Sequence, residues 1–97
     1  MQKGGTVYIM ASPNGNVLYT GVTSDLVKRV WQHKTKFHPE SFTAKYNCVM
    51  LVYYQQFVRV EDAIAEEKRI KGGSRKQKED LINTFNHDWR DLGEDMV

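Results

Sequence analysis

Two tyrosines near the start of the chain are spaced so that their phenols can share one site. Tyr8 and Tyr19 lie 11 residues apart, each within a run of β-prone residues. A turn at Asn14-Gly15 would place the two runs side by side, and the strand register then decides whether both phenols share a face. Two phenols on one face can line a binding site. The alternative is that both are packing residues, a common role for tyrosine in strands.

Arg29 and His33 form a second pair, because a spacing of four residues puts both side chains on one face of a helix. The neighbouring apolar residues recur at helical spacing, so this pair flanks the apolar stripe, at the edge of the core. An arginine there can bind a phosphate through two hydrogen bonds, and a histidine can move a proton or donate to an oxyanion. The alternative is a surface arginine beside a half-buried histidine.

Glu67 stands at an unusual position for a carboxylate. The apolar face of its predicted helix consists of Ala63, Ile64 and Ile70. Glu67 falls close to the middle of that face, where a carboxylate costs free energy unless it is paired or binds a cation. One explanation is a salt bridge to Arg29, Lys68 or Lys71. The other is a divalent ion such as Mg²⁺, which commonly takes one protein carboxylate together with water and phosphate oxygens.

The net charge of the 97-residue chain is only +2, too small by itself to indicate a nucleic-acid-binding protein. The charge is unevenly distributed, with a net charge of +4 over residues 1–48 and −2 over residues 49–97. A dense basic stretch in the second half consists of Lys68, Arg69, Lys71, Arg75, Lys76 and Lys78. Such a stretch can attract phosphate, and the alternative is an ordinary solvated helix surface.

Composition excludes several classes of protein. A hydrophobic content of 40% excludes a disordered chain, and no apolar run approaches the roughly 20 residues of a membrane span. We therefore expect no membrane partner. The first residues have no apolar signal-peptide region. The single cysteine, Cys48, can form neither an intramolecular disulfide nor a cysteine-based zinc site. These features predict a cytoplasmic protein.

The elements that must position the candidate residues follow from residue patterning. The sequence predicts strands at 6–10 and 17–22 joined by the Asn-Gly turn, and a third strand at 49–54. It predicts helices at about 24–35, 61–71 and 75–85, and an irregular loop at 36–47. We expect Thr23 or Ser24 to cap the first helix, Gly72-Gly73 to end the second and Ser74 to cap the third.

The resulting order, β-β-α-β-α-α, predicts an α+β fold in which helices pack on a three-stranded, largely antiparallel sheet. We expect one domain spanning residues 1–97, with a core at about 5–92 and an acidic tail at 93–97.

Taken together, these residues resemble the GIY-YIG nuclease superfamily. Its two tripeptide motifs read Thr6-Val7-Tyr8 and Tyr19-Thr20-Gly21 here, and the order of Arg29, His33 and Glu67 also matches. The segments 67–76 and 86–92 resemble the small single-domain bacterial branch of the superfamily, the UPF0213 proteins. The resemblance covers about residues 5–92, and the fold of the family agrees with the one that the patterning predicts.

The resemblance implies hydrolysis of a DNA phosphodiester bond with one divalent ion, Mg²⁺ or Mn²⁺, held by Glu67. By position, Tyr8 would help to activate the attacking water, as general base or by orienting it. Tyr19 and His33 would hydrogen-bond the scissile group or its leaving oxygen. Arg29 would stabilise charge on the phosphate.

Further residues are expected at the substrate. They are Gly21, Lys68, Lys71, Arg75, Lys76 and Asn86. Because the 97 residues contain no DNA-recognition module, we expect low sequence specificity, recognition of branched, damaged or single-stranded DNA, or a protein partner that supplies specificity. Two alternatives remain open: a non-catalytic nucleic-acid-binding module of the same fold, and a protein-interaction domain.

Overall fold

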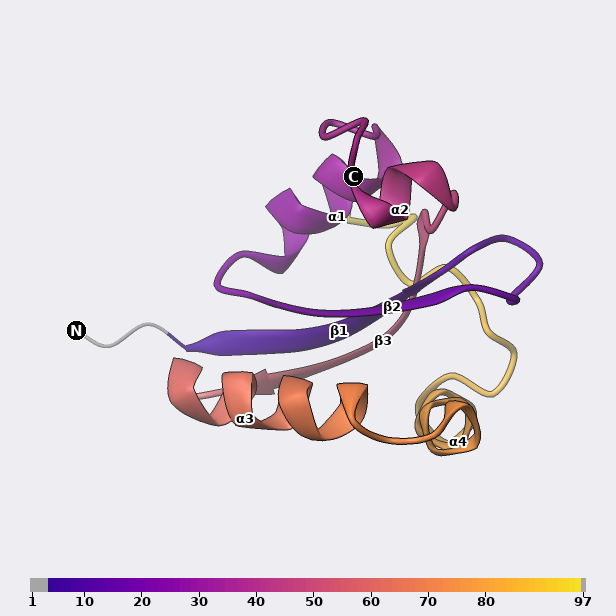
Figure 1. The fold of residues 1–97 in the computed structure, drawn as a ribbon. Helices are drawn as coiled ribbons and strands as arrows, with labels where there is room; N and C mark the ends of the chain where they lie inside the picture. The colour runs from indigo at the N-terminus through magenta and orange to yellow at the C-terminus, as the bar shows by residue number, and fades with distance from the viewer. Residues whose placement is uncertain (1–3, 97) are drawn as a thin grey trace.

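The computed structural model describes residues 4–96 (Figure 1). Three strands, β1 (Gly5–Ala11), β2 (Leu18–Thr23) and β3 (Met50–Phe57), form an antiparallel sheet in the order β2-β1-β3. The helices are α1 (Leu26–Lys34), α2 (Phe42–Lys45), α3 (Val60–Lys71) and α4 (Arg75–Phe85). The predicted α+β fold, a three-stranded antiparallel sheet flanked by helices, is confirmed.

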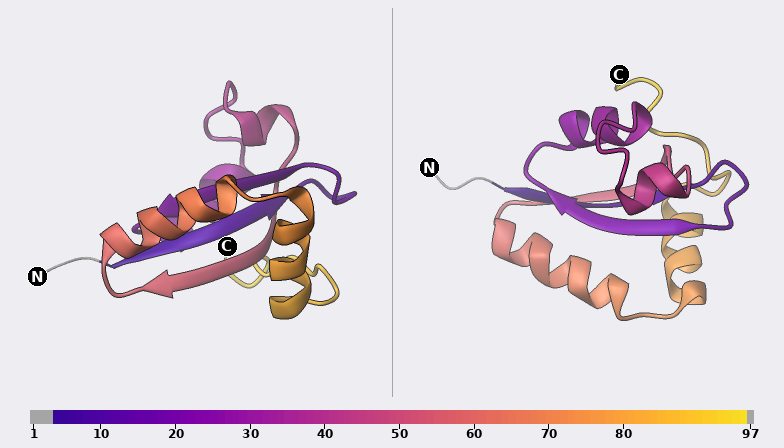
Figure 2. Two further views of the ribbon diagram at one scale, coloured as in Figure 1. Left: turned by 60° about the horizontal axis from the view of Figure 1, so that its bottom comes forward. Right: turned by 45° about the horizontal axis from the view of Figure 1, so that its top comes forward.

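The helices cover both faces of the sheet, as Figures 1 and 2 show. α1 and α2 lie on one face and α3 lies along the other, while α4 runs across the direction of α3 and contacts β3. Among residues 4–96, none of the helices has the length and hydrophobicity that a bilayer crossing demands.

The central strand β1 contributes to two separate clusters, because successive side chains of a strand point to opposite faces. The first, which we call the apolar cluster, consists of Val7, Ile9, Ala11, Val52, Tyr53, Ala63, Ile70 and Ile82. The second, which we call the site-side cluster, consists of Tyr8, Met10, Val30, Cys48 and Leu51. The apolar cluster packs under α3 and α4, and the site-side cluster packs under α1.

The predicted hairpin is confirmed, and its register answers the question about the two tyrosines. Gly15 adopts a φ of 76°, the left-handed conformation that favours glycine, and its amide donates to the Ser12 carbonyl at 2.8 Å. In the antiparallel pairing, Tyr8 lies opposite Gly21 and Met10 lies opposite Tyr19. Tyr19 is two residues from Gly21, so both phenols lie on the α1 side of the sheet.

Two local expectations were wrong. Asp25, and not Thr23 or Ser24, caps α1, because the Asp25 carboxylate accepts a hydrogen bond from the Lys28 amide at 3.1 Å. The Thr23 hydroxyl instead accepts from the Asp25 amide. Residues 36–47 also include a helical turn, α2, whose start is capped by Ser41. This single turn is too short to show an apolar periodicity in the sequence.

The later elements match their predictions closely. The Ser74 hydroxyl caps α4, and Gln77 completes a capping box with it. α3 ends at Lys71, as the Gly72-Gly73 pair predicted. Strand β3 is longer than predicted, since it continues to Phe57.

The segment after α4 lies along the outer side of β3. The Leu92 amide donates to the Leu51 carbonyl at 2.8 Å, and the Asp91 carboxylate accepts from the Leu51 amide at 3.0 Å. Asp91 also forms a salt bridge with Lys34 of α1. These contacts satisfy backbone groups that an edge strand would otherwise leave unpaired. Of the predicted acidic tail, residue 97 lies outside the described residues.

Candidate active site

A chain of hydrogen bonds connects three elements on the α1 side of the sheet. The Tyr8 hydroxyl of β1 lies 2.9 Å from His33 Nε2 in the last turn of α1. His33 Nδ1 lies 2.8 Å from the Thr43 hydroxyl of α2. All three residues are buried, so each polar group is satisfied by the next one in the chain.

The charge of Arg29 acts on both rings of this chain. A nearby positive charge favours the ionised phenol and disfavours the protonated imidazole. Arg29 therefore acts to lower the pKa of Tyr8 and that of His33.

Burial keeps both rings of this chain neutral near pH 7. Burial, together with the charge of Arg29 and the nearby His38, lowers the pKa of His33 from 6.5 to about 4. Burial is also the main reason that the pKa of Tyr8 is raised, with Tyr19 and Glu67 adding to it and Arg29 opposing it. A buried neutral phenol is a weak proton acceptor, so this environment favours the orienting role predicted for Tyr8 over that of general base.

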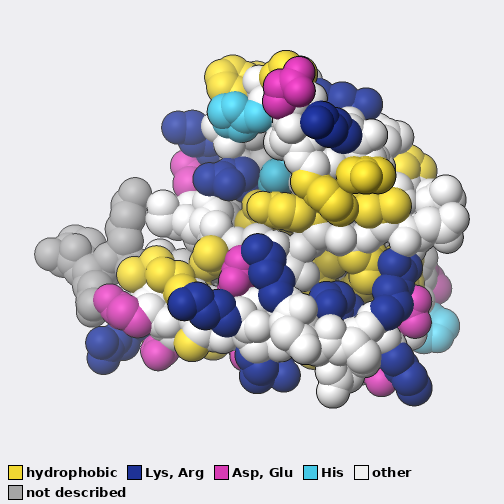
Figure 3. Space-filling model, viewed as in Figure 1, with side chains coloured by type: hydrophobic (Ala, Val, Ile, Leu, Met, Phe, Trp, Pro, Cys, Tyr) yellow, Lys and Arg dark blue, Asp and Glu magenta, His cyan; other side chains and the backbone are white. Residues whose placement is uncertain are grey.

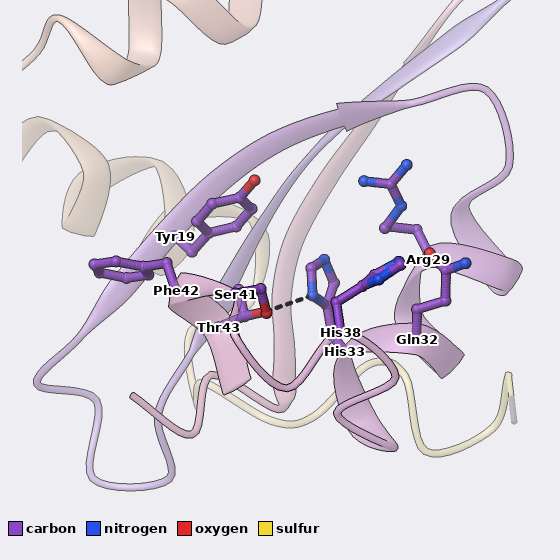
Figure 4. A pocket seen from close by; sticks show the side chains of 8 residues that line it. All are labelled: Tyr19, Arg29, Gln32, His33, His38, Ser41, Phe42 and Thr43. Carbon is purple, nitrogen blue, oxygen red and sulfur yellow. Dashed lines mark hydrogen bonds between the residues drawn. The ribbon is translucent and has the colours of Figure 1, made fainter. Parts of the chain in front are cut away.

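A pocket of about 230 Å³ opens beside this chain (Figure 4). Figure 4 shows the Tyr19 ring on one side of the pocket and Arg29 and Gln32 on the other, with the His33 imidazole between them. The lining residues are Tyr19, Arg29, Gln32, His33, His38, Ser41, Phe42 and Thr43. Tyr8 lies behind this wall, and no part of its side chain is exposed.

A row of aromatic rings leads from the pocket to the surface. The ring centroids of Tyr19 and Phe42 are 6.0 Å apart, and those of Phe42 and Tyr46 are 4.6 Å apart. Phe42 is 46% exposed and Tyr46 is 53% exposed. Figure 3 shows hydrophobic side chains gathered over α2 and the adjoining part of the sheet, with Lys and Arg side chains on either side.

Glu67 approaches the tyrosines from α3. Its side chain is only 13% exposed, and its carboxylate pairs with the Lys71 ammonium at 3.0 Å. The same ammonium lies 5.9 Å from the centre of the Tyr19 ring. The charge of Glu67 also raises the pKa of Tyr8. Of the three cations predicted as salt-bridge partners for Glu67, the structure selects Lys71.

Gly21 lies where the two tyrosines meet the backbone of β2. A Cβ at this position would lie 2.5 Å from the Tyr8 hydroxyl oxygen and 3.0 Å from Cε2 of Tyr19. Packing therefore explains why a glycine stands at this position, since any side chain would collide with the Tyr8 phenol. Its predicted contact with substrate stays a prediction.

The structure thus brings Tyr8, Tyr19, Arg29, His33 and Glu67 into one neighbourhood. The basic stretch is engaged differently. Arg69 pairs with Glu66, and Lys76 pairs with Asp80. The Arg75 guanidinium donates to the carbonyls of Gly15 and Asn16, at the turn between β1 and β2. Phosphate binding by Lys68, Lys71, Arg75 and Lys76 stays a prediction.

Asn86 lies apart from the pocket and holds the chain after α4. It is buried, and its amide group donates to the carbonyls of Val52 and Arg90 at 3.2 and 2.8 Å. Its side-chain oxygen accepts from the Arg90 amide. These bonds give Asn86 a structural task, and the substrate contact predicted for it is not tested by them.

The residues that sequence reasoning missed come mainly from 36–47. Thr43 is the hydrogen-bond partner of His33, and Phe42 packs against Tyr19. The one sequence signal for this wall is Ser41, a residue type that favours helix N-caps. The segment 36–47 is far from Tyr8 and Tyr19 in the sequence, so the sequence does not show that it packs beside them.

The donor set suits a cation that shares its ligands with a substrate. Among the described residues, no group of three or more His, Cys, Asp or Glu side chains is placed to hold a metal ion. Glu67 already holds a positive charge, the Lys71 ammonium, against Tyr19. A single carboxylate of this kind fits Mg²⁺ or Mn²⁺ when water and phosphate supply the other ligands.

The chain is similar to known proteins in both sequence and structure. The family model of the GIY-YIG catalytic domain matches residues 4–80. The UPF0213 protein in the potE 3′ region of Serratia liquefaciens is 34% identical over 77 residues, which cover 79% of this chain and 74% of that relative. The UPF0213 protein SSP2268 of Staphylococcus saprophyticus is 34% identical over 77 residues, which cover 79% of this chain and 92% of that relative.

A solved structure is also similar. The solution NMR structure of the UPF0213 protein BH0048 from Bacillus halodurans superimposes with a TM-score of 0.53 at 30% sequence identity. The match covers 84% of each chain. The family match over residues 4–80 includes the strands and helices that carry Tyr8, Arg29 and Glu67.

Proposed function

Because the chain belongs to the GIY-YIG family, a superfamily of nucleases, and to its UPF0213 group, we propose that it is a divalent-metal-dependent endonuclease that hydrolyses DNA phosphodiester bonds. The observation that carries the proposal is the convergence of Arg29, Tyr19 and a neutral His33 on one pocket. Tyr8 hydrogen-bonds the histidine from behind, and the covered carboxylate of Glu67 lies nearby.

Each group suits a phosphodiester in the pocket. Arg29 can bind two non-bridging oxygens, whose negative charge increases as the phosphorus is attacked. The Tyr19 hydroxyl can donate to a phosphate oxygen or to the leaving oxygen. His33 and Tyr8 hold their positions through the hydrogen bond at 2.9 Å. We assign Tyr8 to this positioning, because its buried phenol does not face the pocket.

Glu67 is the protein ligand that we assign to Mg²⁺ or Mn²⁺. When bound, the ion would neutralise charge that develops on the phosphate oxygens. Glu67 brings one negative charge to the site, so the phosphate itself must complete the ligand set. This requirement links ion binding to the presence of substrate.

The aromatic row supports a substrate with unstacked bases. Phe42 and Tyr46 expose ring surface beside the pocket, and bases stack on aromatic rings without regard to sequence. This agrees with the predicted low sequence specificity and with a single-stranded, branched or damaged substrate.

The decisive experiment measures cleavage of labelled single-stranded, duplex and branched DNA with EDTA, Mg²⁺ or Mn²⁺. We expect metal-dependent cleavage that Glu67→Gln lowers by at least about 100-fold, a loss typical of removing one electrostatic group. Glu66→Gln is the matched control. Glu66 neighbours Glu67 on α3, its side chain is 19% exposed, and it pairs with Arg69, away from the pocket.

Three results would count against the proposal. Cleavage by Glu67→Gln at the wild-type rate would remove Glu67 from the site. Equal losses in Glu66→Gln and Glu67→Gln would indicate a general effect on α3. Salt-dependent DNA binding without cleavage in any metal would favour the non-catalytic binding module instead.

A further inference from the structure

We propose that Lys71 is an exchangeable counter-cation for Glu67, which occupies the carboxylate until a divalent ion and a substrate phosphate arrive together. In this arrangement the Lys71 ammonium suppresses ion binding to the substrate-free protein. The inference rests on the proposed function, because it assumes that Glu67 is the ligand of the ion.

The first observation is the position of the Lys71 ammonium. It lies 3.0 Å from the Glu67 carboxylate and 5.9 Å from the centre of the Tyr19 ring. Lys71 therefore places one positive charge between the predicted metal ligand and a residue that lines the pocket. A divalent ion bound to the same carboxylate would be repelled by this ammonium, so the two cations compete.

The second observation is the difference between the Glu67–Lys71 pair and the ion pairs of the same spacing on α4. A Glu–Lys pair with a spacing of four residues is common on helix surfaces. The carboxylates of Glu79 and Asp80, which form such pairs, are 41% and 60% exposed, whereas that of Glu67 is 13% exposed. A covered carboxylate requires a nearby cation more strongly than an exposed one does. Lys71 meets this requirement when no metal ion is bound.

The third observation is the exposure of the Lys71 side chain. Although its ammonium contacts the covered Glu67, the Lys71 side chain is 53% exposed. A lysine side chain is flexible and carries a compact charge, so Lys71 can leave Glu67 without any movement of the helix. Phosphate oxygens in the pocket would attract the released ammonium, and the ion would then gain both Glu67 and a phosphate oxygen as ligands.

The test is the affinity of the protein for Mn²⁺ without DNA, measured by titration calorimetry and by electron paramagnetic resonance of unbound Mn²⁺. We expect Lys71→Met to bind Mn²⁺ about tenfold more tightly than the wild type, in the range by which one charge alters a neighbouring carboxylate. Lys71→Arg, which keeps the charge, should bind as weakly as the wild type. The gain of Lys71→Met should disappear in the double variant with Glu67→Gln.

Arg69→Gln supplies the matched control. It removes one positive charge from α3 and releases Glu66, whose side chain is 19% exposed, from its partner. Arg69→Gln should leave Mn²⁺ affinity unchanged, because Glu66 acts on Tyr53 of the apolar cluster and not on Tyr8. An equal gain in Arg69→Gln and Lys71→Met would overturn the proposal, since net charge would then explain both.

A second measurement tests the coupling to substrate. A phosphorothioate oligonucleotide should increase the Mn²⁺ affinity of the wild type more than it increases the Mn²⁺ affinity of Lys71→Met. The oligonucleotide also binds Mn²⁺ by itself, and the same titration with Glu67→Gln measures that contribution. Equal increases would overturn the coupling. Cleavage that needs Glu67, combined with an unchanged Mn²⁺ affinity in Lys71→Met, would refute the role of Lys71 alone. If neither Mn²⁺ binding nor metal-dependent cleavage were found in the wild type or in any variant, the proposed function would be refuted as well.

Discussion

The two faces of the sheet differ in what they bury. Under α3 and α4, β1 contributes Val7, Ile9 and Ala11 to an almost entirely aliphatic cluster. Under α1, the same strand contributes Tyr8, whose hydroxyl continues into a hydrogen-bonded chain with His33 and Thr43. Strand β1 therefore contributes to an apolar core on one face and to a hydrogen-bonded polar site on the other.

This difference means that one face of the sheet mainly stabilises the fold, whereas the other carries the groups that could do chemistry. Aliphatic burial stabilises in proportion to area and requires no particular orientation. A buried polar chain requires each donor to meet an acceptor, and among residues 4–96 no buried side-chain polar atom is left without a partner. We expect changes under α3 to lower stability, and changes around Tyr8 to alter the site more than the fold.

The largest effect on stability should come from Ile9→Ala. Ile9 is fully buried in the apolar cluster, so the truncation leaves a cavity and should lower the free energy of unfolding by about 2–5 kcal/mol. Ile64→Ala is the matched control, because Ile64 is 39% exposed on α3 and should cost less than about 1 kcal/mol. Urea unfolding measures both, and equal costs would contradict the central place of the apolar cluster.

The next effect should come from Gly21→Ala. The new methyl group would meet the Tyr8 hydroxyl oxygen at 2.5 Å and Cζ at 2.6 Å, which forces the phenol to move. We expect a loss of about 1–3 kcal/mol, as for other overpacked positions, together with a loss of the Tyr8–His33 hydrogen bond. In Gly72→Ala the methyl group meets nothing closer than 3.4 Å, so this control should stay near wild-type stability. Thermal unfolding and the NMR signals of His33 would report both changes.

Acidification should weaken the site-side face. The pKa of His33 in the folded protein is about 4, below its ordinary value of 6.5, because burial and the charges of Arg29 and His38 oppose protonation. The stabilisation from neutral His33 is therefore complete above about pH 6.5 and is lost as the pH falls towards 4. Its size should be on the order of 2 kcal/mol, since solvent at the pocket screens part of the effect.

Urea unfolding at pH 7.5 and pH 4.5 measures this loss. His33→Gln removes the titrating group, so its stability should depend less on pH than that of the wild type. His87→Gln is the control, because the His87 side chain is 90% exposed. An unchanged pH dependence in His33→Gln would show that other groups cause the acid loss.

The smallest effect on stability should come from Tyr8→Phe. Removing the hydroxyl deletes one hydrogen bond and should cost about 1 kcal/mol. Because we assign Tyr8 to positioning, DNA cleavage should fall by about tenfold, and the NMR signals of the His33 ring nitrogens should change. A loss of about 100-fold or more would instead indicate direct acid–base catalysis by Tyr8.

Tyr53→Phe is the matched control on the opposite face. The Tyr53 hydroxyl donates to Gln55 at 3.1 Å, at the edge of the apolar cluster. Its removal deletes a comparable bond but should leave cleavage and the His33 signals unchanged. A similar drop in cleavage for both variants would contradict the separation between the two faces.

Local rules made much of the fold predictable from the sequence. The Asn14-Gly15 turn and Ser74 as a helix cap depend on residues that are close neighbours in the chain, and both were predicted correctly. The same spacing rules placed Arg29 and His33 on one helical face and Glu67 on a covered face of α3. The cap of α1 was predicted wrongly, because Thr23, Ser24 and Asp25 are all residue types that favour a helix N-cap. The helical turn α2 was missed because four residues are too few to show an apolar periodicity.

The sequence by itself determined the elements and the types of side chain that could do chemistry. Only the tertiary structure decided which residues of different elements pair: Thr43 with His33, and Arg75 with the turn carbonyls of Gly15 and Asn16. It also decided that Tyr8 is buried behind the pocket. The physical reason is that spacing fixes which side of an element a residue occupies. Hydrogen bonds, charge pairing and burial depend instead on distances between elements, which packing of the whole chain sets.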